Sequence, residues 1–143
     1  MKVSEVMTPS VQCIHTEATA QEAAERMKAL DLGSLPVCDN DRLVGMLTDR
    51  DLVIRAMAHG DDPKSTTVRD NMTPDTIFCF EDQNVEDAAR LMRDKQIRRL
   101  LVLNRNKRLV GILSLGDLAM ETQDEHLAAE TLERISEPAM QAW

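Results

Sequence analysis

The sequence repeats itself once, and this repeat constrains the fold more than any other feature of the chain. When the 143-residue sequence is shifted by 65 positions, Met7-Thr8-Pro9 falls on Met72-Thr73-Pro74. One extra residue near Lys107 changes the shift to 66, and Arg42-Leu43-Val44-Gly45 then falls on Arg108-Leu109-Val110-Gly111. A unit of about 60 residues has too small a core to be stable alone, so we expect the two copies to pack together as one body with pseudo-twofold symmetry.

The predicted elements have the same order in each copy. A short helix ends at Met-Thr-Pro because proline stops it, and a strand, a helix, two strands and a second helix follow. The first copy has predicted strands at Val11–His15, Leu35–Cys38 and Leu43–Leu47, with helices beginning after Thr19 and at Asp49. The second copy has predicted strands at Thr76–Phe80, Leu100–Leu103 and Leu109–Leu113, with helices beginning after Asn84 and at Leu115.

Capping and linker residues mark the boundaries of these elements. Thr19 with Glu22, and Asn84 with Asp87, have the spacing of a capping box. The polar segment 60–67 links the copies, and a tail helix is expected over Glu125–Ile135. The sequence therefore predicts a mixed α/β (α+β) fold, with one repeat at 1–61, a second at 62–121 and a C-terminal helical tail at 122–143.

Charge and composition argue against several partners. The formal net charge is −8, and the aromatic residues are 2 Phe and 1 Trp. An acidic chain repels nucleic-acid phosphates, and few aromatic rings are present for base stacking, so we expect no nucleic acid. The same charge argues against a membrane surface, and no signal core or membrane-length apolar run is present. We expect a soluble, cytoplasmic protein.

The cysteines and histidines do not have the spacing of a metal site or a disulfide framework. Cys13, Cys38 and Cys79 are therefore interpreted as small apolar residues of the strands, and no metal is predicted. A redox or metal role stays open if the fold brings Cys13 and Cys79 together.

One motif ends the last strand of each copy and begins the following helix. It runs from Gly45 to Asp51 and from Gly111 to Asp117, as glycine, two apolar residues, a hydroxyl residue, any two residues and aspartate. A helix N-terminus with a hydroxyl donor suits a phosphate. An aspartate repels phosphate but accepts hydrogen bonds from a ribose diol, and the glycines would let the backbone come close to a ligand.

Capping alone is the alternative interpretation of these corners, because Ser/Thr-x-x-Asp is itself a capping box. Thr48 with Asp51, and Ser114 with Asp117, have that spacing without any ligand. The repeated Gly-apolar-apolar lead-in and the aspartate kept in both copies favour a ligand.

Taken together, these motifs resemble those of a tandem pair of CBS domains, a family named after cystathionine β-synthase. The resemblance covers about Val3 to Met120 and rests on Val-x-x-x-Met-Thr-Pro, on Leu35-Pro36-Val37 and on the Leu43–Asp51 end. The tail resembles that of stand-alone bacterial CBS-pair proteins, including the hypoxic-response type. The family implies β-α-β-β-α repeats, two clefts, a homodimer and adenosine-containing ligands such as AMP, ADP, ATP or S-adenosylmethionine.

The resemblance also implies roles for particular residues. Asp51 and Asp117 match ribose ligands, and Thr48 and Ser114 match phosphate ligands. Contacts to the base are implied for one set in each copy: Ile14, His15, Thr16 and Pro36, and Cys79, Phe80 and Leu101. Leu101 stands where the family often has proline.

Arg98 and Arg99 occupy positions where related proteins often place basic phosphate ligands. The first copy has Gly33 and Ser34 there. Residues 85–108 hold eight basic and three acidic side chains, an excess that would attract an anion, although a solvated helix face explains it too. We therefore predict that the two clefts differ in affinity.

Three functions follow as hypotheses. The first is a regulatory sensor of adenine nucleotides that needs no obligatory cofactor and acts on an unidentified protein partner. The second is a protein-interaction scaffold with vestigial clefts. An enzyme is the least favoured, because we find no nucleophile paired with a base, no phosphate loop ending in lysine and no metal cluster.

Overall fold

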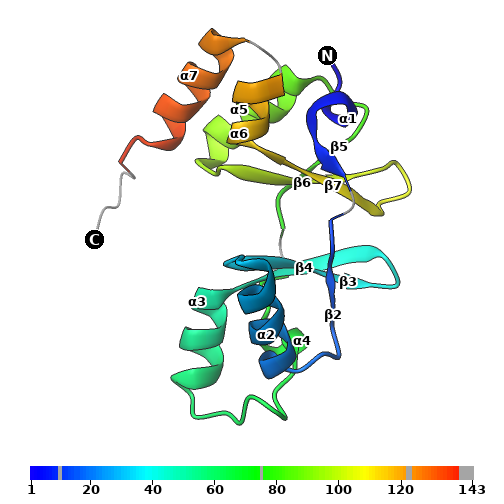
Figure 1. Cartoon of the computed structure of the whole chain (residues 1–143), viewed down its shortest axis with the longest axis vertical. Coiled ribbons are helices and arrows are strands. Elements are labelled where there is room, and N and C mark those ends of the chain that lie inside the picture. Colours follow the sequence, from blue (N-terminus) through cyan, green and yellow to red (C-terminus); the bar gives the residue numbers. More distant parts are fainter. Residues whose placement is uncertain (10, 75, 122–123, 139–143) are drawn as a thin grey trace. The chain divides into compact units, whose positions relative to one another are not determined.

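The chain divides into two units, each with its own sheet and its own core. The computed structural model describes residues 1–9, 11–74, 76–121 and 124–138 (Figure 1). Unit 1 comprises Met1–Val11 together with Ile77–Trp143, and unit 2 comprises Gln12–Thr76. The predicted mixed α/β class is confirmed.

Unit 2 contains a three-stranded sheet with helices on one side (Figure 1). Strand β2 (Ile14–His15) runs parallel to β3 (Ser34–Asp39), and β3 runs antiparallel to β4 (Arg42–Thr48). The helices are α2 (Ala20–Leu30), α3 (Asp49–Asp51) with its π-helical continuation η1 (Leu52–Met57), and α4 (Val68–Asn71).

Unit 1 contains a four-stranded sheet in the order β1-β7-β6-β5. Its strands are β1 (Thr8–Pro9), β5 (Phe78–Phe80), β6 (Arg99–Leu103) and β7 (Leu109–Ser114). Its helices are α1 (Val3–Val6), α5 (Val85–Lys95), α6 (Leu115–Glu121) and α7 (Glu125–Ile135). Figure 1 shows α5, α6 and α7 gathered on one side of this sheet.

The two cores are built from equivalent positions of the repeat. In β3, Leu35 and Val37 point into the core of unit 2, two residues apart as the alternation of a strand requires. Their counterparts Leu100 and Val102 in β6 occupy the core of unit 1. The helices follow the same rule on their buried faces, since Met27 of α2 corresponds to the buried Met92 of α5.

The lead-in segments of the two copies are exchanged between the units. Strand β1, from the first copy, pairs with β7 of the second copy at Thr8↔Ile112. Reciprocally, Thr73 of the second copy bridges Met46 in β4 of the first, with two backbone hydrogen bonds of 2.9 and 2.8 Å. Each unit is therefore completed by the other copy's Met-Thr-Pro segment, which the sequence pattern did not predict.

Two glycines allow this exchange because a side chain at either position would collide with the exchanged segment. A Cβ on Gly111 would lie 2.6 Å from Met7 Sδ and 2.9 Å from the Thr8 carbonyl oxygen. A Cβ on Gly45 would lie 2.8 Å from both Met72 Sδ and the Thr73 carbonyl oxygen. The close backbone approach expected at these glycines is therefore made by the chain's own Met-Thr segments.

The first strand of each copy is shorter than predicted. Strand β2 begins at Ile14 and not at Val11, and its ladder consists of Ile14↔Val37 and His15↔Cys38. Just before the strand, the Cys13 carbonyl accepts a hydrogen bond of 3.0 Å from the Arg26 guanidinium instead of a neighbouring strand. In unit 1, the pairing with β6 begins at Phe78 and not at Thr76.

One of the two predicted capping boxes is present. Thr19 Oγ1 accepts from the Glu22 amide at 3.1 Å, and Glu22 Oε2 accepts from the Thr19 amide at 3.4 Å, which confirms the box at α2. The box at Asn84 is wrong, because its side chain makes no capping hydrogen bond. The amides there have backbone partners instead, since Val85 donates to the Met1 carbonyl at 3.0 Å.

The tail helix has the predicted bounds, Glu125–Ile135, and packs on α5 and α6. Residues 122–123 and 139–143 of the predicted tail lie outside the described residues. The segment 60–67, which links the copies in sequence, lies within unit 2. The boundaries 1–61, 62–121 and 122–143 refer to the sequence repeats and stay a prediction.

Candidate functional site

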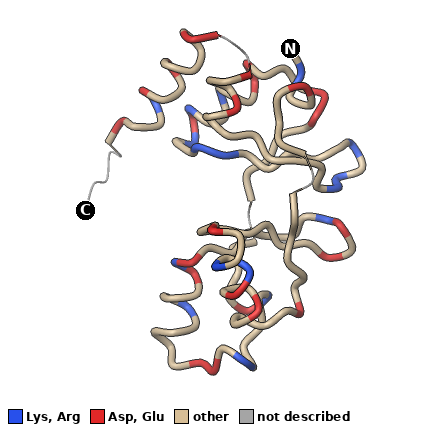
Figure 2. Tube along the Cα trace, in the orientation of Figure 1, with Lys and Arg blue, Asp and Glu red and all other residues tan. Residues whose placement is uncertain are grey.

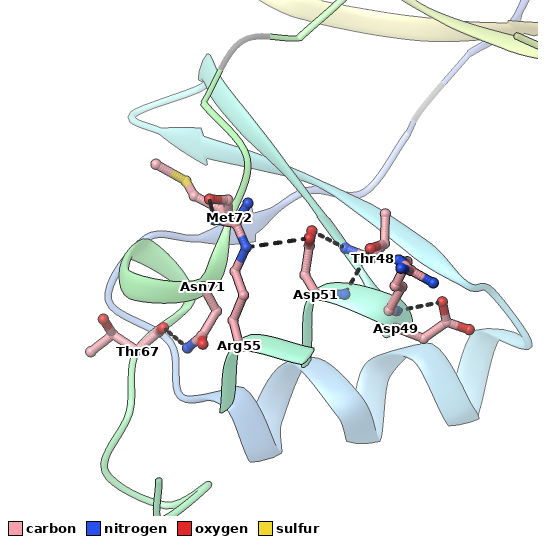
Figure 3. Close-up of polar contacts among 8 residues, drawn as sticks. Thr48, Asp49, Asp51, Arg55, Thr67, Asn71 and Met72 are labelled. Atoms are coloured by element: carbon pink, nitrogen blue, oxygen red, sulfur yellow. Dashed lines mark hydrogen bonds and ion pairs between the residues drawn. The ribbon is translucent and has the colours of Figure 1, made fainter. Parts of the chain in front are cut away.

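The strand-to-helix corner of unit 2 is a complete capping box (Figure 3). The Asp51 amide donates to Thr48 Oγ1, and the Thr48 amide donates to Asp51 Oδ2, both at 3.0 Å. The other carboxylate oxygen, Oδ1, lies 3.8 Å from Arg55 Nε, and the Arg55 guanidinium also donates to the Met72 carbonyl at 3.2 Å. The predicted hydroxyl and carboxylate thus lie together and half-buried.

The corner of unit 1 repeats this geometry with a different third partner. The Asp117 amide donates to Ser114 Oγ at 3.0 Å, and the Ser114 amide donates to Asp117 Oδ2 at 2.9 Å. Here Oδ1 accepts from the hydroxyl of Thr8, in β1, at 3.4 Å.

The capping interpretation therefore describes both corners, but it does not use up their hydrogen-bonding capacity. In each box the hydroxyl oxygen acts as an acceptor, so its own hydrogen is still available to donate. A carboxylate has about four acceptor positions, and the box occupies only part of them. Each corner can therefore donate to a phosphate through Thr48 or Ser114 and accept from a diol through Asp51 or Asp117.

A pocket of about 690 Å³ opens beside the corner of unit 1. Arg98, Arg99 and Ser114 line it, so the structure brings together three of the predicted phosphate ligands. Neither arginine forms an ion pair with a described residue, and both are exposed. Leu115, Gly116 and Ala119 complete this side, whereas Asp117 does not line the pocket. The volume falls within the range of small-molecule sites.

The charged side chains beside the two corners differ. Figure 2 shows basic positions where β6 begins in unit 1. At the equivalent place in unit 2, Gly33 replaces an arginine, and a Cβ on it would lie 3.3 Å from Asp49 Oδ2. Two exposed arginines therefore accompany Ser114, whereas Asp49 takes their place beside Thr48.

The predicted base contacts of the first copy have different environments. Ile14 is buried in the core of unit 2, and Pro36 is buried in β3. His15 is exposed, with Nε2 3.9 Å from Asp39 Oδ1. Thr16 is buried, and its hydroxyl accepts from the Arg69 guanidinium at 3.3 Å.

The predicted base contacts of the second copy are mostly engaged inside unit 1. Cys79 and Leu101 are buried. Phe80 is partly buried, with the Arg105 guanidinium 4.1 Å above its ring and the Phe78 ring edge-on to it at 5.6 Å between centroids. In the sheet, Leu101 lies opposite Phe78, and Phe80 lies opposite Leu103.

The cysteines are divided between the units, with Cys13 and Cys38 in unit 2 and Cys79 in unit 1. Burial and the adjacent Cys13 side chain raise the pKa of the Cys38 thiol, and burial raises the pKa of Cys79 to about 11. Both thiols are therefore protonated near neutral pH. Among the described residues, no group of three or more potential ligands could hold a metal ion.

Within the described part of the chain, no helix has both the length and the apolar character needed to span a membrane.

Sequence reasoning missed two residues that contact the aspartates, Thr8 and Arg55. Thr8 is 109 positions from Asp117, so no local spacing relates them. Arg55 lies four residues after Asp51 and had a signal in the helical i,i+4 rule for ion pairs.

The sequence model of the CBS domain matches residues 3–57 and 67–123. The CBS domain-containing protein YhcV of Bacillus subtilis (strain 168) is 40% identical over 134 residues, which cover 94% of this chain and 94% of that protein. Hypoxic response protein 1 of Mycobacterium tuberculosis (strain ATCC 25618 / H37Rv) is 34% identical over 135 residues, covering 94% of this chain and 93% of the relative.

Two solved structures have a similar fold. The crystal structure of Hypoxic Response Protein I with two coordinated zinc ions has a TM-score of 0.74 at 34% identity, covering 85% of this chain and 98% of that one. The crystal structure of CBSX2 in complex with AMP has a TM-score of 0.72 at 30% identity, covering 85% and 96%.

Proposed function

From the premise that this chain belongs to the CBS-domain family and consists largely of two CBS domains, we propose that it is a regulatory module that binds an adenosine-containing ligand. The observation that carries the proposal is the pocket of unit 1, which Arg98, Arg99 and Ser114 line together and in which neither arginine forms an ion pair with a described residue. The similar CBSX2, crystallised with AMP, supports this choice of ligand class.

The chemistry of the site assigns a part of the ligand to each group. The two guanidiniums and the Ser114 hydroxyl hold the phosphate, because charged donors make the stronger hydrogen bonds to it. Asp117 accepts from the ribose hydroxyls while its capping box persists. In unit 2, Thr48 and Asp51 supply the same pair beside an acidic Asp49, so this corner binds the ligand more weakly or takes one with less negative charge.

We assign recognition of the base to the residues predicted for it in each copy. They fall into two groups, according to whether the side chain is buried or exposed. Ile14, Pro36, Cys79 and Leu101 have buried side chains, so we propose that they act through their backbone groups. His15 is exposed and Phe80 is partly buried, so these two side chains present surfaces to an adenine ring. Thr16 is held by Arg69 and shapes the same segment.

Regulation needs no catalytic step, because a ligand that binds two arrangements of the chain with different affinities shifts the balance between them. No catalytic step is assigned to these groups, which donate and accept hydrogen bonds. The proposed setting is the cytoplasm.

We also propose that the module works as a homodimer through a groove on unit 2. The groove has a volume of about 530 Å³ between α2 and η1, and its wall includes Ala24, Met27 and Leu52. Val53 and Met57 line the same groove, with 49% and 73% of their surface exposed. Exposed apolar patches of this kind mark interaction sites, and we propose that the same patch of a second copy covers it, as a twofold interface requires.

The test of the ligand site separates capping from ribose binding. Asp117→Asn keeps an oxygen that accepts from the Ser114 amide but removes the charged acceptor for the diol. We expect AMP affinity to fall by about 1.5–3 kcal/mol while stability changes little, measured by titration calorimetry and thermal unfolding. Asp51→Asn is the parallel variant in unit 2.

Glu22→Gln is the matched control, because Glu22 occupies the equivalent position of a capping box at Thr19. Its AMP affinity should equal that of the unmodified protein. If AMP binds equally well to all of these variants, the aspartates only cap helices and their assignment to the ribose is wrong. If no nucleotide changes the melting temperature, the alternative of a scaffold with vestigial clefts is favoured, to which the two complete capping boxes already lend support.

A further inference from the structure

The pocket of unit 1 has a wall that the CBS repeat does not supply. Helix α7 begins after the second matched segment, 67–123. Three of its residues, Ala128, Ala129 and Leu132, line the pocket together with the arginines and Ser114. Leu132 lies four positions after Ala128 and three after Ala129, so the three side chains lie toward one side of the helix. The pocket thus combines two basic side chains with an apolar contribution from α7.

Helix α7 is attached to unit 1 by contacts that lie outside this wall. Leu127 is buried in the core, and Thr131 is fully buried. The Thr131 hydroxyl donates to the Leu127 carbonyl at 2.7 Å and accepts from the Arg93 guanidinium at 3.3 Å.

The C-terminal end of α7 is tied to the segment that leads to the two arginines. The Gln96 side chain donates to the carbonyls of Arg134 at 3.2 Å and Glu137 at 2.9 Å. Gln96 lies two residues before Arg98, so the position of α7 and the position of the arginines are set by one short segment.

We propose that α7 is the third wall of the ligand site and that Ala128, Ala129 and Leu132 determine which phosphate-bearing ligand fits. The inference rests on the proposed function and deepens it. The phosphate lies on Arg98, Arg99 and Ser114, and the α7 wall bounds the part of the ligand that adjoins the phosphate, while the ribose and base keep the partners assigned above.

A ligand held in this way connects β6 and α6 to α7, so its binding stabilises the packing of α7 on the rest of unit 1. The tail thereby reports whether the site is occupied, because ligand binding raises the free energy needed to detach the helix. The amides of α7 should then exchange with solvent more slowly in the presence of ligand.

The experiment uses the whole chain, with AMP and inorganic pyrophosphate as separate probes. Ala129→Leu narrows the pocket at the α7 wall, and leucine, like alanine, is a good helix former. We expect it to weaken AMP binding about tenfold or more by crowding and to change pyrophosphate binding less than about twofold. His126→Leu adds the same side chain where the helix is exposed and should leave both affinities unchanged. Hydrogen exchange across α7 should slow when AMP binds.

The outcomes separate this inference from the proposed function. If AMP binds and depends on Asp117, but Ala129→Leu is neutral and α7 exchange is unaffected, the wall is refuted and the ligand site stands. If no adenosine ligand binds, the proposed function fails, and the wall, which rests on it, fails with it.

Discussion

At the scale of residues, the aspartates of the two corners combine a structural and a binding capacity. Asp51 and Asp117 each accept from the amide three residues earlier, which fixes the helix start. Their spacing to Thr48 and Ser114 was readable from the sequence because capping is local. The partners of their second oxygens, Arg55 and Thr8, were not predicted. The Thr8 contact in particular depends on how distant segments meet.

The pH dependence of the chain can be examined at His59. Its Nδ1 lies 2.9 Å from Asp61 Oδ1, and this hydrogen bond and the charge of Asp61 raise the pKa of His59 above its ordinary 6.5. The stabilising contribution is therefore fully present below pH 6.5 and is lost as the pH rises through the folded-state pKa. It is small because the pair is exposed.

An NMR titration of the His59 ring measures this directly. The midpoint should lie above 6.5 and should return toward that value in Asp61→Asn. A midpoint that does not move in this variant would show that Asp61 is not the cause.

At the scale of elements, the apolar periods of the sequence were sufficient to predict the helices and the longer strands. The pairing of the exchanged segments could not be predicted from them. The apolar period of 3.6 predicted α7 within its observed bounds, and the apolar runs of β3, β4, β6 and β7 were found within one or two residues. The pairing of β1 with β7 was missed because a Met-Thr-Pro segment carries no apolar alternation. The sequence of this segment shows where the preceding helix ends but not which strand the segment pairs with.

The two strand glycines test the exchange. In Gly111→Ala the new Cβ meets Met7 and the Thr8 backbone, and in Gly45→Ala it meets Met72 and the Thr73 backbone. We expect each change to reduce the free energy of unfolding by about 1–3 kcal/mol, as overpacking does, measured by urea denaturation.

Gly116→Ala is the matched control for stability. Its Cβ would lie 3.5 Å from Ser114 Oγ, an ordinary contact. Since Gly116 lies in a helix, alanine there should stabilise the chain by up to about 1 kcal/mol. Equal effects at all three glycines would contradict the close approach of the exchanged segments.

At the scale of the whole molecule, the repeat determined most of what was predictable. It indicated two related cores and two ligand corners, and the family match confirms the tandem pair. The difference between the corners was only partly visible. Arg98 and Arg99 were predicted as phosphate ligands, but their place beside Ser114 required the fold. The contribution of α7 to that pocket required it too, because the apolar stripe of a tail helix does not show which cavity it faces.

The proposed dimer can be tested with one substitution in each unit. Met57→Glu places a charge in the apolar groove of unit 2, so burying it in an interface becomes costly. We expect the mass measured by light scattering to fall from two chains to one. Met120→Glu is the control, because Met120 is the repeat counterpart of Ile54 and is 78% exposed on unit 1. If Met57→Glu stays dimeric, or if Met120→Glu alone dissociates the dimer, the groove is not the interface.

The central claim is that the chain binds an adenosine-containing ligand, and a calorimetric titration of the unmodified protein tests it most directly. AMP, ADP, ATP and S-adenosylmethionine are titrated separately at low ionic strength, where the contribution of Arg98 and Arg99 is least screened. We predict saturable heat for at least one of the four. The absence of binding by all four at concentrations up to about 1 mM, which corresponds to about −4 kcal/mol, would contradict the account.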